Sequence, residues 1–125
     1  MANKQEGKLR VAVIGTGNMG RNHVRNYFML PESELVAIAD VNPEAKSLAD
    51  DYKVKFFTDY KEMLEKARPD AVSVVVPTPF HLEVATEVMS RGIHCMLEKP
   101  IASSVEEADK LIACAKKNNV TFTVG

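Results

Sequence analysis

Residues 9–20 read LRVAVIGTGNMG, an apolar run that passes directly into a glycine-rich turn. The run, residues 9–14, is broken only by Arg10 and is typical of a parallel strand covered on both faces. The turn is Gly15-Thr16-Gly17-Asn18-Met19-Gly20, the pattern G-x-G-x-x-G. In this pattern Gly15 permits a tight turn, Gly17 lets the backbone approach a pyrophosphate, and Gly20 lets a helix pack closely on the sheet. We therefore expect a strand, a phosphate-binding turn and the start of a helix.

Beyond this stretch, short apolar runs alternate with helical patterns. Further strands are predicted at residues 35–39, 54–57, 71–76, 93–97 and 120–124. Five helices are predicted between the strands. The first ends before Pro31, the second is capped by Asn42 and starts at Pro43, and the third is capped by Thr58 and ends before Pro69. The fourth runs from about Phe80 to Arg91 and is ended by Gly92, and the fifth starts at a capping box of Ser104 and Glu107 or of Ser103 and Glu106. The buried helix stripes are predicted to be Val24, Tyr27 and Phe28; Ala45, Leu48, Ala49 and Tyr52; Met63, Leu64 and Ala67; Val84, Ala85 and Val88; and Val105, Ala108, Leu111, Ile112 and Ala115. This alternation predicts an α/β fold, a doubly wound parallel six-stranded Rossmann sheet with strand order 3-2-1-4-5-6.

Composition narrows the class of protein. The 125 residues carry a formal net charge of −1, so the chain has no net positive charge to attract the phosphates of a nucleic acid. We therefore expect no nucleic-acid partner. No apolar run is long enough for a membrane span, and the polar residues 1–8 are expected to form a flexible tail and not a signal peptide. Cys95 and Cys114 have no metal-ligand spacing and are interpreted as small apolar residues of a cytoplasmic protein, so no metal site is predicted.

Asp40 ends the second predicted strand, twenty residues after Gly20. A carboxylate there can accept both hydroxyls of an adenosine ribose, and its charge would repel a 2′-phosphate. The alternative is a turn residue or helix cap ahead of Pro43. With the glycine turn present we favour ribose binding, and NAD over NADP because no Arg or Lys directly follows Asp40.

The loop after the fourth strand is Pro77-Thr78-Pro79-Phe80-His81. Two prolines keep it extended, which suits a wall against a flat ring. His81 is either a contact to cofactor or substrate or a local hydrogen-bonding residue, and the sequence leaves both open. His23, past the phosphate-facing turn of the first helix, is interpreted as structural.

Glu98-Lys99-Pro100 follows the fifth strand. A surface loop could carry these residues by chance, but they share the carboxyl edge of the predicted sheet with the glycine turn and Asp40, where open α/β sheets bind ligands. Strand five lies two places from strand one, about 10 Å at ~4.8 Å per strand. That offset matches the distance from a pyrophosphate to a nicotinamide, and Lys99 there could exchange a proton with a substrate hydroxyl.

On these residues the chain resembles the Gfo/Idh/MocA oxidoreductases, which include glucose–fructose oxidoreductase and inositol dehydrogenase. The resemblance runs from Leu9 to Gly125. Its most specific element is Leu97-Glu98-Lys99-Pro100-Ile101-Ala102, which is similar to the E-K-P signature of the family. The glycine turn with Met19, the position of His23, the loop Thr78-Pro79-Phe80-His81 and the closing Thr121-Phe122-Thr123-Val124-Gly125 agree with it.

The resemblance implies a role for each matching residue. The glycine turn, including Asn18 and Met19, would hold the pyrophosphate of NAD, and Asp40 the adenosine ribose. The nicotinamide side would be lined by the loop that contains Pro77, Thr78, Pro79 and His81. Glu98 would lie near the nicotinamide ribose, and Lys99, joined to Pro100 by a cis peptide, would be the catalytic lysine.

Relatives of this family continue into a second α+β domain, which supplies further acid/base residues and most of the substrate pocket. We expect residues 9–125 to be the dinucleotide-binding domain alone, taken from a homo-oligomeric dehydrogenase of sugars, cyclitols or nucleotide-sugars. Such a fragment should bind NAD but catalyse poorly, because positioning the substrate can supply ~7–11 kcal/mol of the barrier. Two alternatives are a non-catalytic NAD-binding sensor or scaffold and, disfavoured by Glu98-Lys99-Pro100, a fold that binds S-adenosylmethionine.

Overall fold

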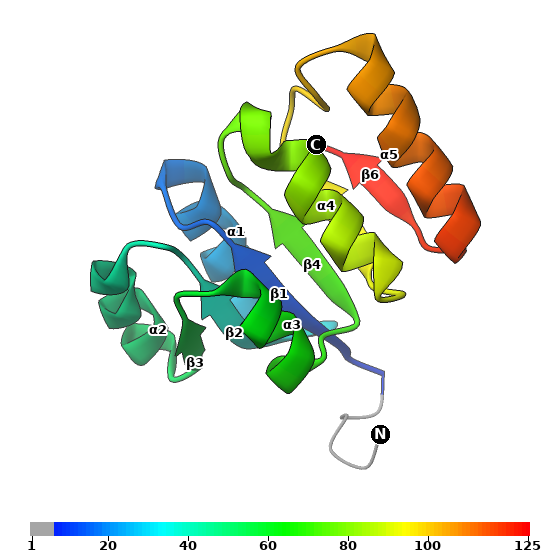
Figure 1. Cartoon of the computed structure of the whole chain (residues 1–125). Helices are drawn as coiled ribbons and strands as arrows, with labels where there is room; N and C mark the ends of the chain where they lie inside the picture. Colours follow the sequence, from blue (N-terminus) through cyan, green and yellow to red (C-terminus); the bar gives the residue numbers. More distant parts are fainter. Residues whose placement is uncertain (1–6) are drawn as a thin grey trace.

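A single parallel sheet organises residues 7–125, the part of the chain that the computed structural model describes (Figure 1). Its strands are β1 (Leu9–Ile14), β2 (Ser33–Ala39), β3 (Lys55–Phe57), β4 (Ala71–Val74), β5 (His94–Leu97) and β6 (Phe122–Val124). They lie in the order β3-β2-β1-β4-β5-β6, and each neighbouring pair is parallel. The predicted fold class and strand order are confirmed.

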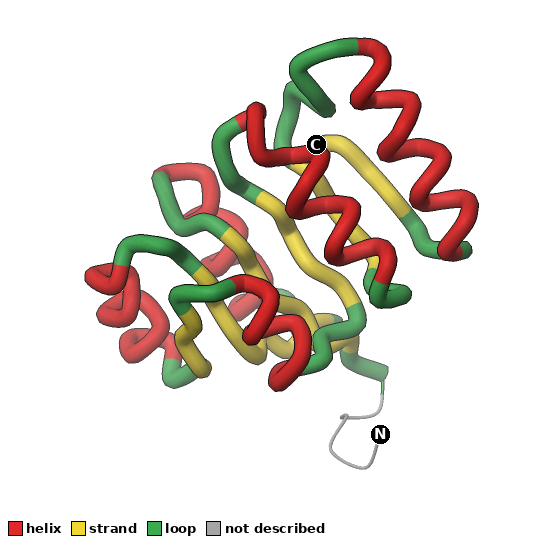
Figure 2. Tube along the Cα trace, in the orientation of Figure 1, coloured by secondary structure: helices red, strands yellow, loops and turns green. Residues whose placement is uncertain are grey.

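Helices cover both faces of the sheet (Figure 2). They are α1 (Asn18–Met29), α2 (Lys46–Tyr52), α3 (Tyr60–Ala67), α4 (His81–Ser90) and α5 (Val105–Asn118), with short 3₁₀ turns η1 (Pro43–Ala45) and η2 (Thr78–Phe80). None of these helices is long and apolar enough to cross a membrane. The predicted tail, residues 1–8, lies outside the described residues except for Gly7 and Lys8.

The core has two halves, one on each face of the sheet. Helices α3, α4 and α5 pack on one face, where Met63, Met89 and Leu111 are fully buried. Helices α1 and α2 pack on the other, around Val13, Val24 and Ile38. Because side chains alternate between faces along a strand, the continuous apolar runs of β1 and β2 supply both halves.

Several predicted boundaries were wrong by one to two residues. β2 begins at Ser33 and β4 ends at Val74, whereas the apolar runs suggested 35 and 76. β3, β5 and β6 each start one or two residues later than predicted. Asp59, not Thr58, caps α3, because its carboxylate accepts the backbone N–H of Lys61 at 2.9 Å.

Three residues predicted to be buried are exposed. Phe28 is 56%, Val105 80% and Ile112 43% exposed. Val105 is the first residue of α5, where a helical stripe has not yet reached the sheet, and Phe28 lies edge-on against Tyr52 over the rim of the second core, at a ring distance of 4.9 Å. Helical periodicity finds the inward face but not where its margins and ends leave the sheet.

The helix ends carry caps of two kinds. Ser104 accepts the backbone N–H of Glu107 at 3.1 Å, as one of the two predicted boxes requires, while the Glu107 carboxylate accepts from the N–H of Ser103 at 3.2 Å. The C-caps that follow helices α2, α3 and α5 are Lys53, Arg68 and Asn119, and all three residues have left-handed backbones with φ near 50° to 60°.

Candidate functional site

The carboxyl ends of the strands finish in register. Ile14 pairs with both Ala39 and Val74, and Val74 pairs with Leu97. Backbone hydrogen bonds extend this ladder by one residue, because Gly15 N–H donates to the Ala39 carbonyl at 2.8 Å and Glu98 N–H to the Val74 carbonyl at 3.2 Å. The glycine turn, Asp40, the loop after β4 and Glu98-Lys99-Pro100 therefore leave the sheet at one edge.

Two glycines of the turn are required by packing. Gly15 has φ +96°, and a Cβ there would lie 2.2 Å from the Val75 carbonyl oxygen. A Cβ on Gly20 would lie 2.0 Å from the Gly15 carbonyl oxygen. Because both contacts are with backbone atoms, neither position accepts a side chain without a shift of the turn or of α1.

Gly17 differs from both, because a Cβ built on it would meet nothing within 4 Å. It is the N-cap of α1, contributes no capping side chain, and the first turn of the helix holds no acidic residue. The N–H groups of this turn point along the helix axis, with the positive end of the helix dipole behind them. A diphosphate fits this end of α1, and a side chain at position 17 would stand in its approach.

Asp40 is held rigidly by the glycine turn. Its Oδ2 accepts hydrogen bonds from the backbone N–H and the hydroxyl of Thr16, at 2.8 and 2.5 Å, and its Oδ1 accepts the N–H of Asn42 at 2.9 Å. Partial burial raises the pKa of this carboxyl, but the hydrogen bonds from Thr16 and Asn42 outweigh burial and leave the pKa lowered. The side chain is thus an ionised acceptor, fixed beside the turn that would hold the phosphates.

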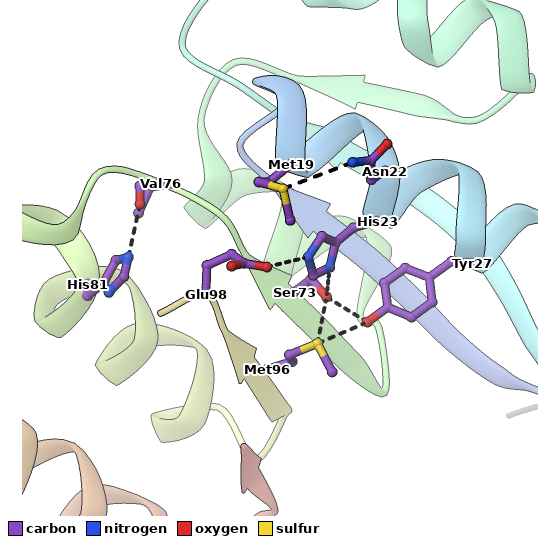
Figure 3. A network of polar contacts seen from close by, with 9 residues as sticks. All are labelled: Met19, Asn22, His23, Tyr27, Ser73, Val76, His81, Met96 and Glu98. Atoms are coloured by element: carbon purple, nitrogen blue, oxygen red, sulfur yellow. Dashed lines mark hydrogen bonds and ion pairs between the residues drawn. The ribbon is translucent and has the colours of Figure 1, made fainter. Parts of the chain in front are cut away.

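The loop after β4 is fastened by His81. The ring is 1% exposed, and its Nε2 lies 2.9 Å from the Val76 carbonyl oxygen (Figure 3). Its Nδ1 lies 3.3 Å from the carbonyl oxygen of Ile101. This geometry ties the loop to the segment that follows Glu98-Lys99-Pro100. Of the loop residues, Pro77 and Pro79 are exposed and Thr78 is half-buried. The assignment of Pro77, Thr78, Pro79 and His81 to a cofactor site stays a prediction.

Lys99 stands at the rim. Its backbone N–H donates to the Gly125 carbonyl at 3.2 Å, and the peptide bond to Pro100 is cis, as the family resemblance implied. The side chain is exposed, and among residues 7–125 its Nζ has no ion-pair partner. The backbone is therefore fixed while the amine is free to meet a ligand.

Glu98 turns inward from the same segment and meets a polar cluster that sequence reasoning missed. The cluster joins His23 and Tyr27 of α1 to Ser73 of β4 and to the Glu98 carboxylate, with Met96 of β5 beside them (Figure 3). One signal was available, since Ser73 is the single polar residue in the run AVSVVV and a buried hydroxyl needs a partner. The partners themselves lie 46 to 50 residues away in the chain.

A separate cavity of about 540 Å³ lies at the opposite, amino edge of the sheet, lined by residues that include Leu9, Arg68, Arg91 and His94. It contains none of the predicted site residues. The predicted site residues lie instead at the carboxyl edge, where the glycine turn, Asp40, Glu98 and Lys99 supply the polar groups that an extended ligand would bind.

The sequence model described as "Oxidoreductase family, NAD-binding Rossmann fold" (GFO_IDH_MocA) matches residues 9–125. UDP-N-acetylglucosamine 3-dehydrogenase of Acidithiobacillus ferrooxidans is 37% identical over 118 residues, which are 94% of this chain and 36% of the relative. The crystal structure of scyllo-inositol dehydrogenase from Lactobacillus casei with bound NAD(H) and scyllo-inositol superposes with a TM-score of 0.89 at 26% identity, over 94% of this chain and 36% of that one. The WlbA dehydrogenase from Bordetella pertussis, in complex with NADH and UDP-GlcNAcA, superposes with a TM-score of 0.89 at 28% identity, over 94% and 37%.

The chain thus spans about a third of the length of these relatives. The family match extends over the whole described sheet, from the first residue of β1 to the residue after β6. The glycine turn, the acidic end of β2 and the parallel strand order are the features of a dinucleotide-binding fold. The chain belongs to the Gfo/Idh/MocA oxidoreductase family, and residues 9–125 are its NAD-binding Rossmann domain.

Proposed function

We propose that this domain binds NAD in preference to NADP, and that it serves a longer dehydrogenase acting on a sugar, cyclitol or nucleotide-sugar. The observation that carries the cofactor preference is the placement of Asp40. Its oxygens already accept three hydrogen bonds from Thr16 and Asn42, which leaves about one of the four acceptor sites of the carboxylate, on Oδ1, for a ribose hydroxyl. The 2′-phosphate of NADP would meet this anion.

The residues that directly follow Asp40 in the chain offer that phosphate no cation. Val41, Asn42 and Pro43 follow it without a cation, and the next basic residue, Lys46, is paired with Asp50 at 3.0 Å. The NAD(H) and NADH bound by the scyllo-inositol dehydrogenase and WlbA support the same preference.

Isothermal titration of the chain with NAD and NADP tests the preference. Wild type should bind NAD more tightly than NADP. Asp40→Asn, which keeps the shape of the side chain but removes its charge, should lower the affinity for NAD and reduce the ratio of NAD affinity to NADP affinity. Asp109→Asn, an exposed carboxylate on α5, is the matched control and should change neither affinity. Equal affinities in wild type, or an unchanged ratio in Asp40→Asn, would count against the assignment.

The proposed reaction assigns the proton to Lys99. When bound, NAD would supply the acceptor for a hydride that leaves the substrate carbon bearing the hydroxyl. In its neutral form, the exposed amine of Lys99, whose backbone N–H is bonded to the Gly125 carbonyl, would receive the hydroxyl proton. Loss of a general base lowers the rate of the chemical step about 10²–10⁴-fold.

The corresponding test uses the full-length protein. Lys99→Met should lower kcat by that factor while NAD affinity changes by no more than a few-fold. Normal turnover by this variant would refute the role of Lys99 as the base, whereas NAD binding without any turnover by the wild-type protein would favour the alternative of a non-catalytic NAD-binding module.

A further inference from the structure

Four side chains form a continuous hydrogen-bonded series, here called the His23 relay: Tyr27, Ser73, His23 and Glu98. Tyr27 Oη lies 2.6 Å from Ser73 Oγ, Ser73 Oγ lies 3.0 Å from His23 Nδ1, and His23 Nε2 lies 2.9 Å from Glu98 Oε2. Figure 3 shows the series crossing from α1 over β4 to the end of β5. It is mostly shielded, since Ser73 is 1% exposed and the side chains of His23 and Glu98 are 14% and 16% exposed.

The chemistry of the groups gives the relay a direction. An ionised carboxylate only accepts, so His23 must donate from Nε2. A neutral imidazole then accepts at Nδ1, which requires Ser73 to donate its hydroxyl proton and to accept that of Tyr27. In this arrangement each hydroxyl and ring nitrogen has a partner, and the donors all point toward Glu98.

Burial alone does not explain this arrangement. Ser73 and Tyr27 satisfy one another at 2.6 Å without help from His23. Among residues 7–125, His23 is the only hydrogen-bond partner of the Glu98 carboxylate, and it bonds Oε2 alone. Burying a carboxylate that has a single hydrogen-bond donor costs free energy, and such incompletely satisfied charges are typical of ligand-binding sites.

The relay also joins the two ends of the candidate site. His23 and Tyr27 belong to α1, the helix that starts at the glycine turn. Glu98 directly precedes Lys99, and its backbone is fixed to β4 through the Val74 carbonyl. A displacement of α1 relative to the sheet would therefore be transmitted to the Glu98-Lys99 segment through these side chains.

We propose that His23 is a positioning residue that orients the Glu98 carboxylate, so that Oε1 accepts a hydrogen bond from a hydroxyl of the ribose next to the nicotinamide. The proposal rests on the proposed binding of NAD at this edge. The adenosine half of the cofactor would lie at Asp40 and would not contact the relay. Loss of His23 should then weaken binding of one half of NAD only.

Titration with NAD and with ADP tests this, because ADP shares the adenosine and both phosphates but lacks the second ribose and the nicotinamide. In His23→Leu the Kd for NAD should rise about tenfold, the usual scale for a hydrogen bond to a charged group, while the Kd for ADP stays within about twofold. His23→Gln, whose amide can still donate to Glu98, should recover most of the loss. Arg25→Gln, exposed on the same helix, is the control and should match wild type.

An equal loss of NAD and ADP affinity in His23→Leu, or no recovery in His23→Gln, would overturn the relay, since a general disturbance of α1 affects both ligands. Failure of wild type to bind either ligand would overturn the proposed function instead. The relay then remains testable by ¹⁵N NMR of the free protein. His23 should carry its proton on Nε2, and Ser73→Ala should shift the Nδ1 resonance; a proton on Nδ1 refutes the proposed direction.

Discussion

Gly17→Ser should preserve the stability of the domain while lowering its affinity for NAD. Gly17 has φ −69° and ψ −163°, an extended conformation open to any residue, and a Cβ there meets no atom within 4 Å. Serine is a better N-cap than glycine by a few tenths of a kcal/mol, because its hydroxyl accepts an N–H of the first helical turn. The unliganded Gly17→Ser domain should therefore be as stable as wild type or slightly more so.

The same hydroxyl competes for the N–H groups that a diphosphate needs, and its Cβ occupies the approach to them. A hydrogen bond to a charged group is worth about 1.5–3 kcal/mol, so losing one lowers affinity about ten- to hundredfold at ~1.4 kcal/mol per tenfold. Loss of a second contact would place binding beyond detection. Stability and affinity should thus move in opposite directions in one variant.

Two measurements suffice: urea unfolding of the free domain followed by circular dichroism, and calorimetric titration with NAD. Gly17→Ala is the comparison, since it adds the Cβ without the capping hydroxyl. Undiminished NAD affinity in Gly17→Ser would refute the placement of the pyrophosphate, and a loss of more than about 1 kcal/mol of stability would refute the open environment of this glycine.

Three further outcomes follow from the described contacts. Gly15→Ala should lower the free energy of unfolding by at least about 2 kcal/mol in urea melts, because a Cβ at φ +96° lies 2.2 Å from the Val75 carbonyl oxygen; normal stability would mean that the turn is not held as described. The lowered pKa of Asp40 makes its carboxylate stabilising above its ordinary value of 3.8, and this contribution is lost as pH falls further through the folded-state pKa; the stability gap between wild type and Asp40→Asn should therefore narrow below about pH 4, and a constant gap contradicts it. Burial, with a smaller effect of Cys114, raises the pKa of the Cys95 thiol to about 12, so mass spectrometry after iodoacetamide treatment at pH 8 should find Cys114 modified well before Cys95 in the native domain.

The sheet was predictable because its information is local. Each strand is a short apolar run next to a turn residue, and right-handed crossovers then determine the order. Strand ends were less accessible: Val75 and Val76 continue the apolar run of β4, yet only Val75 N–H reaches the Ile14 carbonyl before the chain turns away. Hydrophobicity does not record where a ladder of hydrogen bonds stops.

The candidate site divides in the same way. The shared edge of Gly15, Gly20 and Asp40 could be predicted from spacing, because the glycine turn and Asp40 directly follow β1 and β2. The link between His23 and Glu98 could not, since the two residues are 75 positions apart and meet only when β1, β4 and β5 lie side by side. The interpretation of His23 as structural considered its helix and not the strand beneath it.

The C-cap residues with left-handed backbones are positions at which the domain can be made more stable. Lys53, Arg68 and Asn119 each hold a conformation that glycine adopts more easily, and all three lie away from the residues assigned to the cofactor. Exchanging such a residue for glycine removes a steric cost of roughly 1–2 kcal/mol, partly offset by the larger entropy of the unfolded chain. A hardier domain for crystallography or ligand screening can therefore be engineered at these three termini without altering the chemistry of the opposite rim.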